Sequence, residues 1–289
     1  MKSTDHLSYL QSYINKIPAL PSTVTKVIQL CNHEATTPMD LKKIISLDPV
    51  LTGKILQLIN SAYYGFSQEI TSLVSAIIMM GMNTVKHLVL NMAILSTLNR
   101  LTHPFALNLD KFWAHSLGVA VVSKWIAEKR NIPSDHTESY FIIGLLHDIG
   151  KIVLSNQIAQ RYLETIEYAS THQLPLYIAE NNLLQFNHTD IGKLIVERWK
   201  LSSDICDTIT YHHQPFHYTG THKDQIYTVI LANSLINMLD IGFSGNAFPE
   251  DIPIDILEFL DIDLPQLDKI ESMVFSEIDK AKIFLTLSN

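Results

Sequence analysis

The sequence has little glycine and proline, with 10 and 11 of its 289 residues. Together they make about 7% of the chain, against roughly 12% in an average protein, so few turns are available. An all-β fold of this length would need many more turns, and long helices are expected instead. Cysteine is also scarce, because Cys31 and Cys206 stand alone and far apart. This excludes a disulfide framework and a cysteine-rich zinc site, and we expect a reducing cytoplasm as the location.

A surplus of basic residues is lacking too, since 21 Lys and Arg face 29 Asp and Glu for a formal net charge of −8. Nucleic-acid binders need positive charge to neutralise phosphates, so nucleic acid is not an expected partner. Long apolar runs are absent as well. The most apolar region, residues 73–98, is interrupted by polar residues such as Asn83 and Lys86, and it falls short of the ~18 uninterrupted apolar residues of a membrane span. We expect two buried helices that meet at Gly81, and no membrane as partner.

Helix start signals are frequent in the first hundred residues. Thr37-Pro38 and Asp48-Pro49 each join a capping residue to a proline in the first helical position. Ser22 precedes an apolar stripe that reaches Cys31. The later helices are expected near residues 71–80, 83–98, 110–130, 134–148, 156–171, 175–186, 188–200, 203–213, 222–240 and 263–287.

The segment from Thr102 to Asn108 is the best candidate for a boundary, because it is short, contains Pro104 and separates two long helical patterns. We therefore expect an all-α, two-lobed bundle, with residues 1–105 in one lobe and residues 106–289 in the other. Residues 243–253 are expected to form a surface loop.

The thirteen histidines include several on the apolar faces of predicted helices. Four separate helices bring imidazoles to such faces, and one of them adds a carboxylate: His115, His147 with Asp148, His188, and His212 with His213. Each histidine alone is compatible with a core residue whose nitrogens bond the backbone. Burying every such group unpaired would cost roughly 1–3 kcal/mol each, which a shared metal would avoid. Nitrogen and oxygen donors without sulfur favour Fe, Mn, Zn or Mg. Both interpretations stay open at this point.

Residues 144–151, Gly-Leu-Leu-His-Asp-Ile-Gly-Lys, resemble the signature of the HD superfamily of metal-dependent phosphohydrolases. In the N-terminal half, residues 17–21, 46–51, 60–65 and 76–81 resemble the HDOD family, the HD-related output domains of bacterial signalling. The resemblance spans roughly residues 10–240. It implies that the metal ligands are His115, His147, Asp148, His188, His212 and His213. It also implies a phosphate contact for Lys151, for which a solvated lysine at a helix end is the alternative.

The sequence departs from the related HD-GYP phosphodiesterases at two positions that carry charge. Lys111 stands where those enzymes have a metal-holding glutamate, and Asn233 stands where a closing aspartate is expected. No Gly-Tyr-Pro motif follows His213. A like charge ~4 Å from a metal ion repels it by about 4 kcal/mol per unit-charge pair, unless Lys111 turns to solvent. Asp148 is then the only clear anionic ligand, and we expect one bound metal or a vestigial site.

Two hypotheses of different class follow from these residues. The first is a regulatory HDOD module that acts by binding signalling proteins or a nucleotide second messenger, without turnover. The alternative is a metal-dependent phosphodiesterase or phosphohydrolase acting on a nucleotide such as a cyclic dinucleotide, in which Asp148 and Lys151 take part in catalysis.

Overall fold

The computed structural model describes residues 11–15, 17, 19–31, 33, 35–98, 105–262 and 270–288, and the regular elements in this part of the chain are helices. Within these residues there is no β-strand, so the predicted all-α class is confirmed. The helices of the first hundred residues are α2 (Ser22–Cys31), α3 (Pro38–Ile45), α4 (Pro49–Ile59), α5 (Leu73–Met80) and α6 (Met82–Leu98). Those that follow are α7 (Leu109–Lys129), α8 (Ser134–Leu146), α9 (Ile149–Gln157), α10 (Ala159–His172), α11 (Leu176–Leu184), α12 (His188–Trp199), α13 (Ser203–Tyr211), η1 (Pro215–His217), α14 (Lys223–Met238), α15 (Ile254–Leu260), α17 (Ile270–Ala281) and α18 (Ile283–Ser288).

The predicted helix starts in the N-terminal part are confirmed. Thr37 and Asp40 form a reciprocal capping box at the start of α3, and Asp48 accepts a hydrogen bond of 2.9 Å from the backbone N–H of Leu51 in α4. Each cap satisfies backbone donors that a helix start leaves unpaired. The helices then bury apolar side chains such as Leu41 and Ile55 in the core.

The apolar region from Leu73 to Leu98 forms two helices that meet at Gly81, as predicted. Gly81 has φ +83°, a left-handed conformation that ends α5, and the two helix axes differ by 113°. Among the described residues, no single helix is both long and apolar enough to cross a membrane, although this bent pair meets the criterion by length and composition. Most side chains of α6 are buried within the protein.

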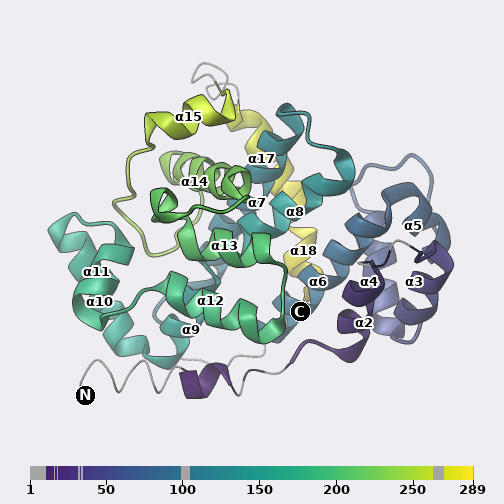
Figure 1. Cartoon of the computed structure of the whole chain (residues 1–289), viewed down its shortest axis with the longest axis horizontal. Helices are drawn as coiled ribbons and strands as arrows, with labels where there is room; N and C mark the ends of the chain where they lie inside the picture. Colours follow the sequence, from purple (N-terminus) through teal and green to yellow (C-terminus); the bar gives the residue numbers. More distant parts are fainter. Residues whose placement is uncertain are drawn as a thin grey trace.

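The helices that follow residue 105 surround α7 and α8 (Figure 1). Helix α7 packs against α8 and α14, and α12 packs against α9 and α13. Helices α2 to α5 lie at one end of the molecule, and α10 and α11 lie at the other. The C-terminal helix α18 packs against α4 and α6, so the last helix contacts the first part of the chain. The boundary near residue 105 stays a prediction, and its residues Thr102, His103 and Pro104 lie outside the described part.

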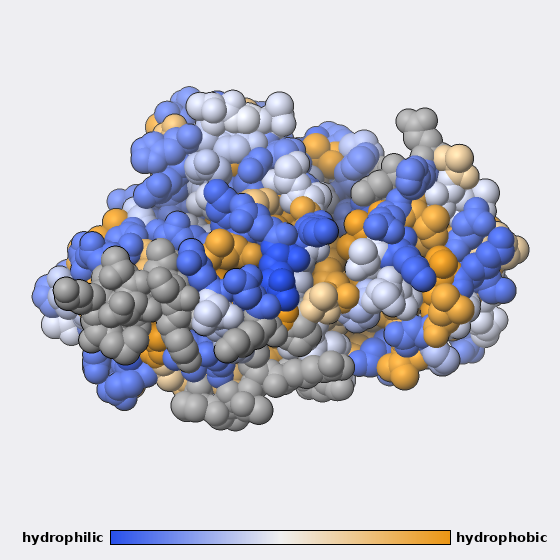
Figure 2. Space-filling model, turned by 60° about the horizontal axis from the view of Figure 1, so that its bottom comes forward, coloured by the Kyte–Doolittle hydropathy of each residue, from blue (hydrophilic) through white to orange (hydrophobic). Residues whose placement is uncertain are grey.

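The surface combines polar and apolar side chains. The view in Figure 2 shows orange, apolar residues among blue ones, many of them on the side of α2 to α5. The exposed large apolar residues of these helices and their connections include Leu47, Val50, Ile78 and Met79.

Two expectations about elements were wrong, and a third is confirmed only in part. Helix α9 was not predicted, because every residue from Ile149 to Ser155 is buried and the segment has no polar face to reveal a helical period. The predicted helix over residues 263–287 is divided: α17 ends at Ala281 and α18 begins at Ile283, while residues 263–269 lie outside the described part. The third is the expected surface loop over residues 243–253, which has no regular secondary structure and is exposed at Phe243 and residues 247–249, but in which Ser244 and Asn246 are buried.

Candidate metal centre

The junction of α8 and α9 places His147 and Asp148 in the interior. His147 follows the last residue of α8, and Asp148 precedes the first residue of α9. Two glycines allow the close packing at this junction. A Cβ at Gly144 would lie 2.8 Å from the Cα of Ala120 in α7, and one at Gly150 would lie 2.0 Å from the carbonyl oxygen of His188. The contact at Gly150 brings α12, with His188 at its first position, against Asp148.

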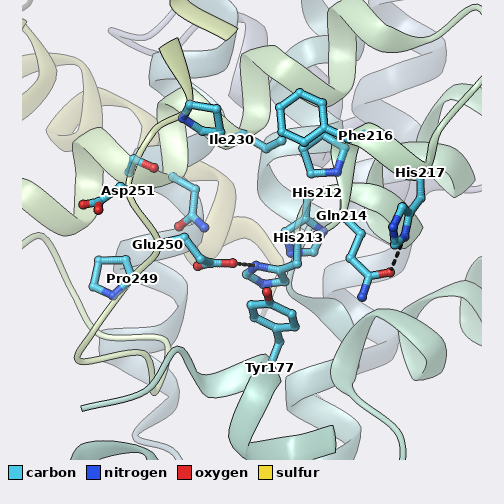
Figure 3. A pocket seen from close by; sticks show the side chains of 14 residues that line it. Tyr177, His212, His213, Gln214, Phe216, His217, Ile230, Pro249, Glu250 and Asp251 are labelled. Atoms are coloured by element: carbon cyan, nitrogen blue, oxygen red, sulfur yellow. Dashed lines mark hydrogen bonds and ion pairs between the residues drawn. The ribbon is translucent and has the colours of Figure 1, made fainter. Parts of the chain in front are cut away.

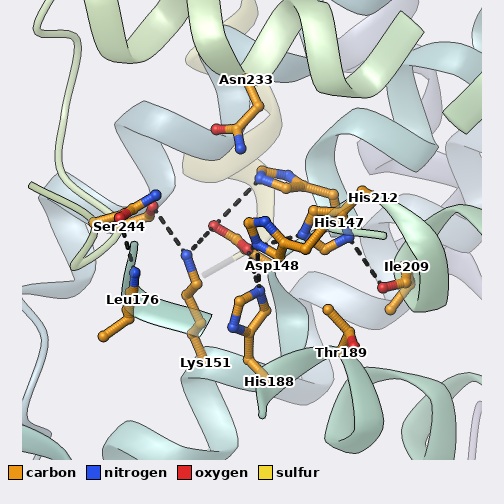
Figure 4. Close-up of polar contacts among 12 residues, drawn as sticks. His147, Asp148, Lys151, Leu176, His188, Thr189, Ile209, His212, Asn233 and Ser244 are labelled. Atoms are coloured by element: carbon orange, nitrogen blue, oxygen red, sulfur yellow. Dashed lines mark hydrogen bonds and ion pairs between the residues drawn. The ribbon is translucent and has the colours of Figure 1, made fainter. Parts of the chain in front are cut away.

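All six residues predicted as ligands lie in one buried cluster (Figure 4 shows its centre). They form two donor groups that share Asp148. We call His115, His147 and Asp148 the three-donor group, and Asp148, His188, His212 and His213 the four-donor group. Within each group the possible ligand atoms lie within 4.8 Å of one another.

The carboxylate of Asp148 connects the two groups. Its Oδ2 lies 3.2 Å from Nε2 of His147, while its Oδ1 lies 3.2 Å from Nε2 of His188 and 3.6 Å from Nε2 of His212. The imidazole of His213 lies beside that of His188, with 3.1 Å between their Nε2 atoms. Four distant segments of the chain thus bring donor atoms to one place.

In four of the histidines, Nδ1 faces a hydrogen-bond acceptor outside the donor groups, so Nε2 is the nitrogen that faces the cluster. These histidines are His147, His188, His212 and His213. The Nδ1 of His147 lies 2.8 Å from the carbonyl oxygen of Gly144, and that of His212 lies 3.0 Å from the carbonyl oxygen of Ile209. A carbonyl oxygen only accepts, so each Nδ1 carries the proton and each Nε2 presents a lone pair. The Nδ1 atoms of His188 and His213 also carry a proton, because each faces a carboxylate.

Several of these inward-facing atoms have no partner. Nε2 of His147, Oδ1 of Asp148 and Nε2 of His212 are buried without a hydrogen bond to any described residue. Buried polar atoms of this kind normally find a partner, and lone pairs directed at one another gain nothing. A divalent cation in the four-donor group would satisfy Oδ1 of Asp148 and Nε2 of His212, and imidazole nitrogens with a carboxylate suit Fe, Mn or Zn. The residues present therefore fit a metal, and the cluster could hold one.

Two glutamates support the rings, and the sequence reasoning missed both. Glu180 of α11 is fully buried; its Oε2 accepts from Nδ1 of His188 at 2.6 Å, and its Oε1 accepts from the hydroxyl of Tyr162 at 2.6 Å. Burial opposes both charges, yet the contact raises the pKa of His188 and lowers the pKa of Glu180. Glu250 accepts from Nδ1 of His213 at 2.5 Å. Carboxylates behind metal-binding histidines fix ring orientation and raise ring basicity.

Lys151 lies inside the cluster, so its interpretation as a solvated lysine was wrong. It is 1% exposed, and its Nζ lies 2.7 Å from Oδ2 of Asp148 and 3.3 Å from Oγ of Ser244. Burial alone would raise the pKa of Asp148, but His147 and Lys151 hold it well below its usual range. The carboxylate shared by both donor groups therefore stays ionised, with an ammonium group on one oxygen.

The two positions that depart from HD-GYP enzymes behave differently from each other. Lys111 is exposed at the surface, so its ammonium group escapes the repulsion that a site position would create. Oδ1 of Asn233 lies 3.0 Å from Nε2 of His115 and also accepts from Asn237. Because an amide oxygen only accepts, Nε2 of His115 donates to Asn233. Burial lowers the pKa of His115 to about 3, so its ring is neutral.

The loop after α14 is exposed in part, as predicted, but its buried residues contact the cluster. We call residues 241–250 the strap. Its Phe243 N–H donates to the carbonyl oxygen of Lys111 at 2.9 Å, and its Asn246 accepts from the backbone N–H of Leu176 at 3.0 Å. With the contacts of Ser244 and Glu250, these bonds join the strap to α7, to the cluster and to the start of α11.

A pocket of about 350 Å³ opens beside the four-donor group (Figure 3). It lies between the turn that follows His213 and the chain from Pro249 to Pro253, with Tyr177 at one edge. His212 and His213 form part of its wall, so a small molecule in the pocket would lie against the cluster.

Comparison with known proteins gives the family. The model of the HDOD domain matches residues 17–215, more than half of the chain, and confirms the resemblance seen in the N-terminal motifs. An uncharacterized protein of Treponema pallidum (strain Nichols) is 24% identical over 253 residues, which cover 88% of this chain and 48% of that relative. The chain thus spans about half the length of the curated relative it matches.

Three solved structures share the fold. An HDOD domain protein with unknown function from Geobacter sulfurreducens has a TM-score of 0.71 at 23% identity, covering 100% of this chain and 99% of that one. A "Putative phosphohydrolase" from Shewanella amazonensis SB2B has a TM-score of 0.71 at 22% identity, covering 96% and 97%. A "Putative signal transduction protein" from Marinobacter aquaeolei VT8 has a TM-score of 0.75 at 18% identity, covering 99% and 65%.

Proposed function

Because this chain belongs to the HDOD domain family, we propose that it is a regulatory module of signal transduction that acts by binding, without catalytic turnover, and that its buried cluster holds a divalent metal. The ion pair between Lys151 and Asp148 is the observation that carries this proposal. It places a cation 2.7 Å from the carboxylate that both donor groups share. A second metal ion would have to bind against that charge.

The four-donor group is the half of the cluster that we propose holds the metal. Asp148 offers Oδ1 there, on the side of the carboxylate away from Lys151, and His188 and His212 direct their Nε2 atoms toward it. A bound divalent ion would supply Lewis acidity at this position. Glu180 and Glu250 hold two of the rings in place, and Lys151 keeps Asp148 ionised.

The three-donor group is less suited to a metal. In this group, Oδ2 of Asp148 accepts a hydrogen bond from Lys151, and Nε2 of His115 donates to Asn233. Hydrolysis of a phosphodiester by two metals requires both ions held ~3.5–4 Å apart. Glu180 and Glu250 accept from the Nδ1 atoms of His188 and His213, on the sides of these rings away from the donor groups. Asp148 therefore remains the carboxylate that offsets the repulsion between two ions. These contacts support one metal and no turnover.

The second candidate is a metal-dependent phosphohydrolase or phosphodiesterase. Two donor groups that share one carboxylate favour it, as this is the arrangement of a two-metal site. In that case Asp148 would connect the ions and Lys151 would contact phosphate, which requires Lys151 to leave its present partner.

The partners that we propose are signalling proteins or a nucleotide second messenger, in the cytoplasm. The net charge of −8 supports neither nucleic acid nor an anionic membrane as a partner.

Elemental analysis of protein purified without chelators tests the metal. We expect about one divalent metal per chain, retained in His115→Ala and lost in His212→Ala, with circular dichroism to show that both variants fold. Metal lost equally from both variants would contradict the assignment to the four-donor group, and a metal-free wild type would contradict a bound metal altogether.

Hydrolysis of bis(4-nitrophenyl) phosphate and of a cyclic dinucleotide tests turnover in the same preparations. We expect none in the wild type. Two metals per chain with turnover that depends on Asp148 would overturn the binding function and establish the phosphohydrolase.

A further inference from the structure

The pocket beside the four-donor group is of a size and shape that suit a small molecule. Its volume of about 350 Å³ lies at the lower end of the ~300–1,000 Å³ of ligand sites. One wall is the turn from His213 to His217, and the other is the chain from Pro249 to Pro253 (Figure 3).

The charges of this pocket argue against an anionic ligand. The described residues that line it include the carboxylates of Glu250 and Asp251 and neither lysine nor arginine. Lys151, the cation of the cluster, is buried and already paired with Asp148. In the metal-free protein, a phosphate in the pocket would approach two carboxylates without a lysine or arginine among the described lining residues to offset them, so it would be repelled.

The remaining walls offer flat rings and hydrogen-bonding groups. The rings of Tyr177 and His213 are stacked, with centroids 4.5 Å apart and planes 10° apart, and Phe216 is 58% exposed at the opposite side. Gln214 and Asn233 add amide groups. Aromatic faces stack on planar heterocycles, while carboxylates and amides bond to ring nitrogens and amino groups.

We propose that this pocket binds a planar nitrogen heterocycle that carries amino groups and no phosphate, such as a nucleobase or a nucleoside. The ring stacks on Phe216, and the amino groups donate to the carboxylates of Glu250 and Asp251. The inference rests on the proposed binding function, and it names for this pocket a ligand class that lacks the phosphate of the nucleotide proposed above. It does not depend on a metal in the cluster.

Calorimetric titration of the full chain, treated with chelator, tests the proposal directly. The probes are adenosine, guanosine and cytidine, each compared with its 5′-monophosphate. We expect at least one nucleoside to bind and its monophosphate to bind roughly tenfold more weakly. Binding by none of the three nucleosides, or equal or tighter binding of the monophosphates, overturns the proposal. Because the protein is metal-free, this result is independent of the elemental analysis that tests the cluster.

Matched variants locate the site. Phe216→Ala should weaken nucleoside binding about tenfold, whereas Phe275→Ala, an exposed phenylalanine of α17, should leave it unchanged. Asp251→Asn should reduce the difference in affinity between nucleoside and monophosphate, and Glu258→Gln at an exposed position of α15 should not. Equal effects of the pocket variants and their controls would place the binding elsewhere and contradict the proposal.

Discussion

Lys151 is the residue that neutralises the carboxylate of Asp148 when no metal is bound. It is buried with Asp148, and its ammonium group also donates to the hydroxyl of Ser244. A buried ion pair contributes little compared with apolar residues of the same volume, but the removal of one partner leaves the other as a buried, uncompensated charge. The lysine therefore acts as an internal counter-ion for a carboxylate that also suits a metal.

The variant Lys151→Met tests this role. In the presence of chelator, we expect its free energy of unfolding to fall by roughly 3–5 kcal/mol, because Asp148 loses its counter-ion. Added Mn²⁺ or Zn²⁺ should recover more stability in the variant than in the wild type, since the metal replaces the missing charge. Urea unfolding with and without metal measures both. Lys193→Met on the exposed face of α12 is the control, and equal stability of the two variants would contradict the counter-ion role.

His87 of α6, which lies outside the cluster, makes the free energy of unfolding depend on pH. Burial and the neighbouring Lys86 lower its pKa from 6.5 to about 4, and its Nδ1 is buried without a partner among the described residues. The folded state keeps this ring neutral while the unfolded chain takes up a proton below pH 6.5. The contribution of the neutral His87 ring to the free energy of unfolding is therefore complete above pH 6.5 and is lost as the pH falls toward 4.

The variant His87→Leu should lose less stability than the wild type between pH 6.5 and 4. The difference should approach ~1.4 kcal/mol per pH unit, the slope for one proton. Urea unfolding at half-unit pH steps measures it, with His172→Leu, an exposed residue of α10, as control. Parallel pH profiles for wild type and His87→Leu would show that the ring titrates normally in the folded state.

The strap is the element that completes the site. Gly242 allows it to lie against α7, because its φ is +70° and a Cβ there would lie 2.4 Å from both the backbone N of His115 and the carbonyl oxygen of Lys111. Beyond this glycine, Ser244 contacts Lys151 and Glu250 contacts His213. One backbone position thus controls how closely the strap covers the cluster.

Gly242→Ala should destabilise the protein by about 1–3 kcal/mol, because alanine is strained at this φ and collides with α7. The metal content should fall with it, since the strap positions His213 through Glu250. Gly53→Ala is the control: a Cβ at this position of α4 meets nothing within 4 Å, and we expect a stabilisation of about 0.5–1 kcal/mol. Thermal melts and elemental analysis give both readouts, and an undisturbed Gly242→Ala would mean that the strap adapts.

The elements also explain which parts of the site could be predicted. The histidines were recognisable because each interrupts an apolar helical stripe, and Glu180 has the same signal between Ala179 and Leu184 in α11. Helix α9 was missed because it is buried on all sides and has no amphipathic period. The strap was missed because its contacts join segments far apart in the chain, such as Ser244 and Lys151, and no local pattern encodes them.

The molecule as a whole has a single continuous core. Buried apolar residues connect Ile14 near one end of the chain with Leu287 near the other, across the boundary predicted near residue 105. A polar contact crosses it as well, because Lys124 of α7, which forms an ion pair with Glu138 of α8, donates to the hydroxyl of Tyr63. A core shared in this way favours unfolding as one unit, although the sequence predicts two lobes.

Phe284 of α18 is where this coupling can be tested. It is fully buried, with its ring centroid 4.8 Å from that of Phe141 in α8 and 5.2 Å from that of Tyr63 after α4. Phe284→Ala should cost about 3–5 kcal/mol, because it leaves a cavity between the two halves, whereas Phe275→Ala at an exposed position should cost little.

Two unfolding signals, measured on the same variant, distinguish a protein that unfolds as one unit from one whose predicted lobes unfold separately. Circular dichroism follows all helices, whereas tryptophan fluorescence follows Trp113 and Trp125 of α7 and Trp199 of α12, which all lie after the predicted boundary. We expect the two signals to shift together to lower urea in Phe284→Ala, since the loss is shared by a common core. A fluorescence transition that stays at the wild-type midpoint while part of the helical signal is lost earlier would show that the predicted lobes fold independently, and that the cluster does not depend on α18.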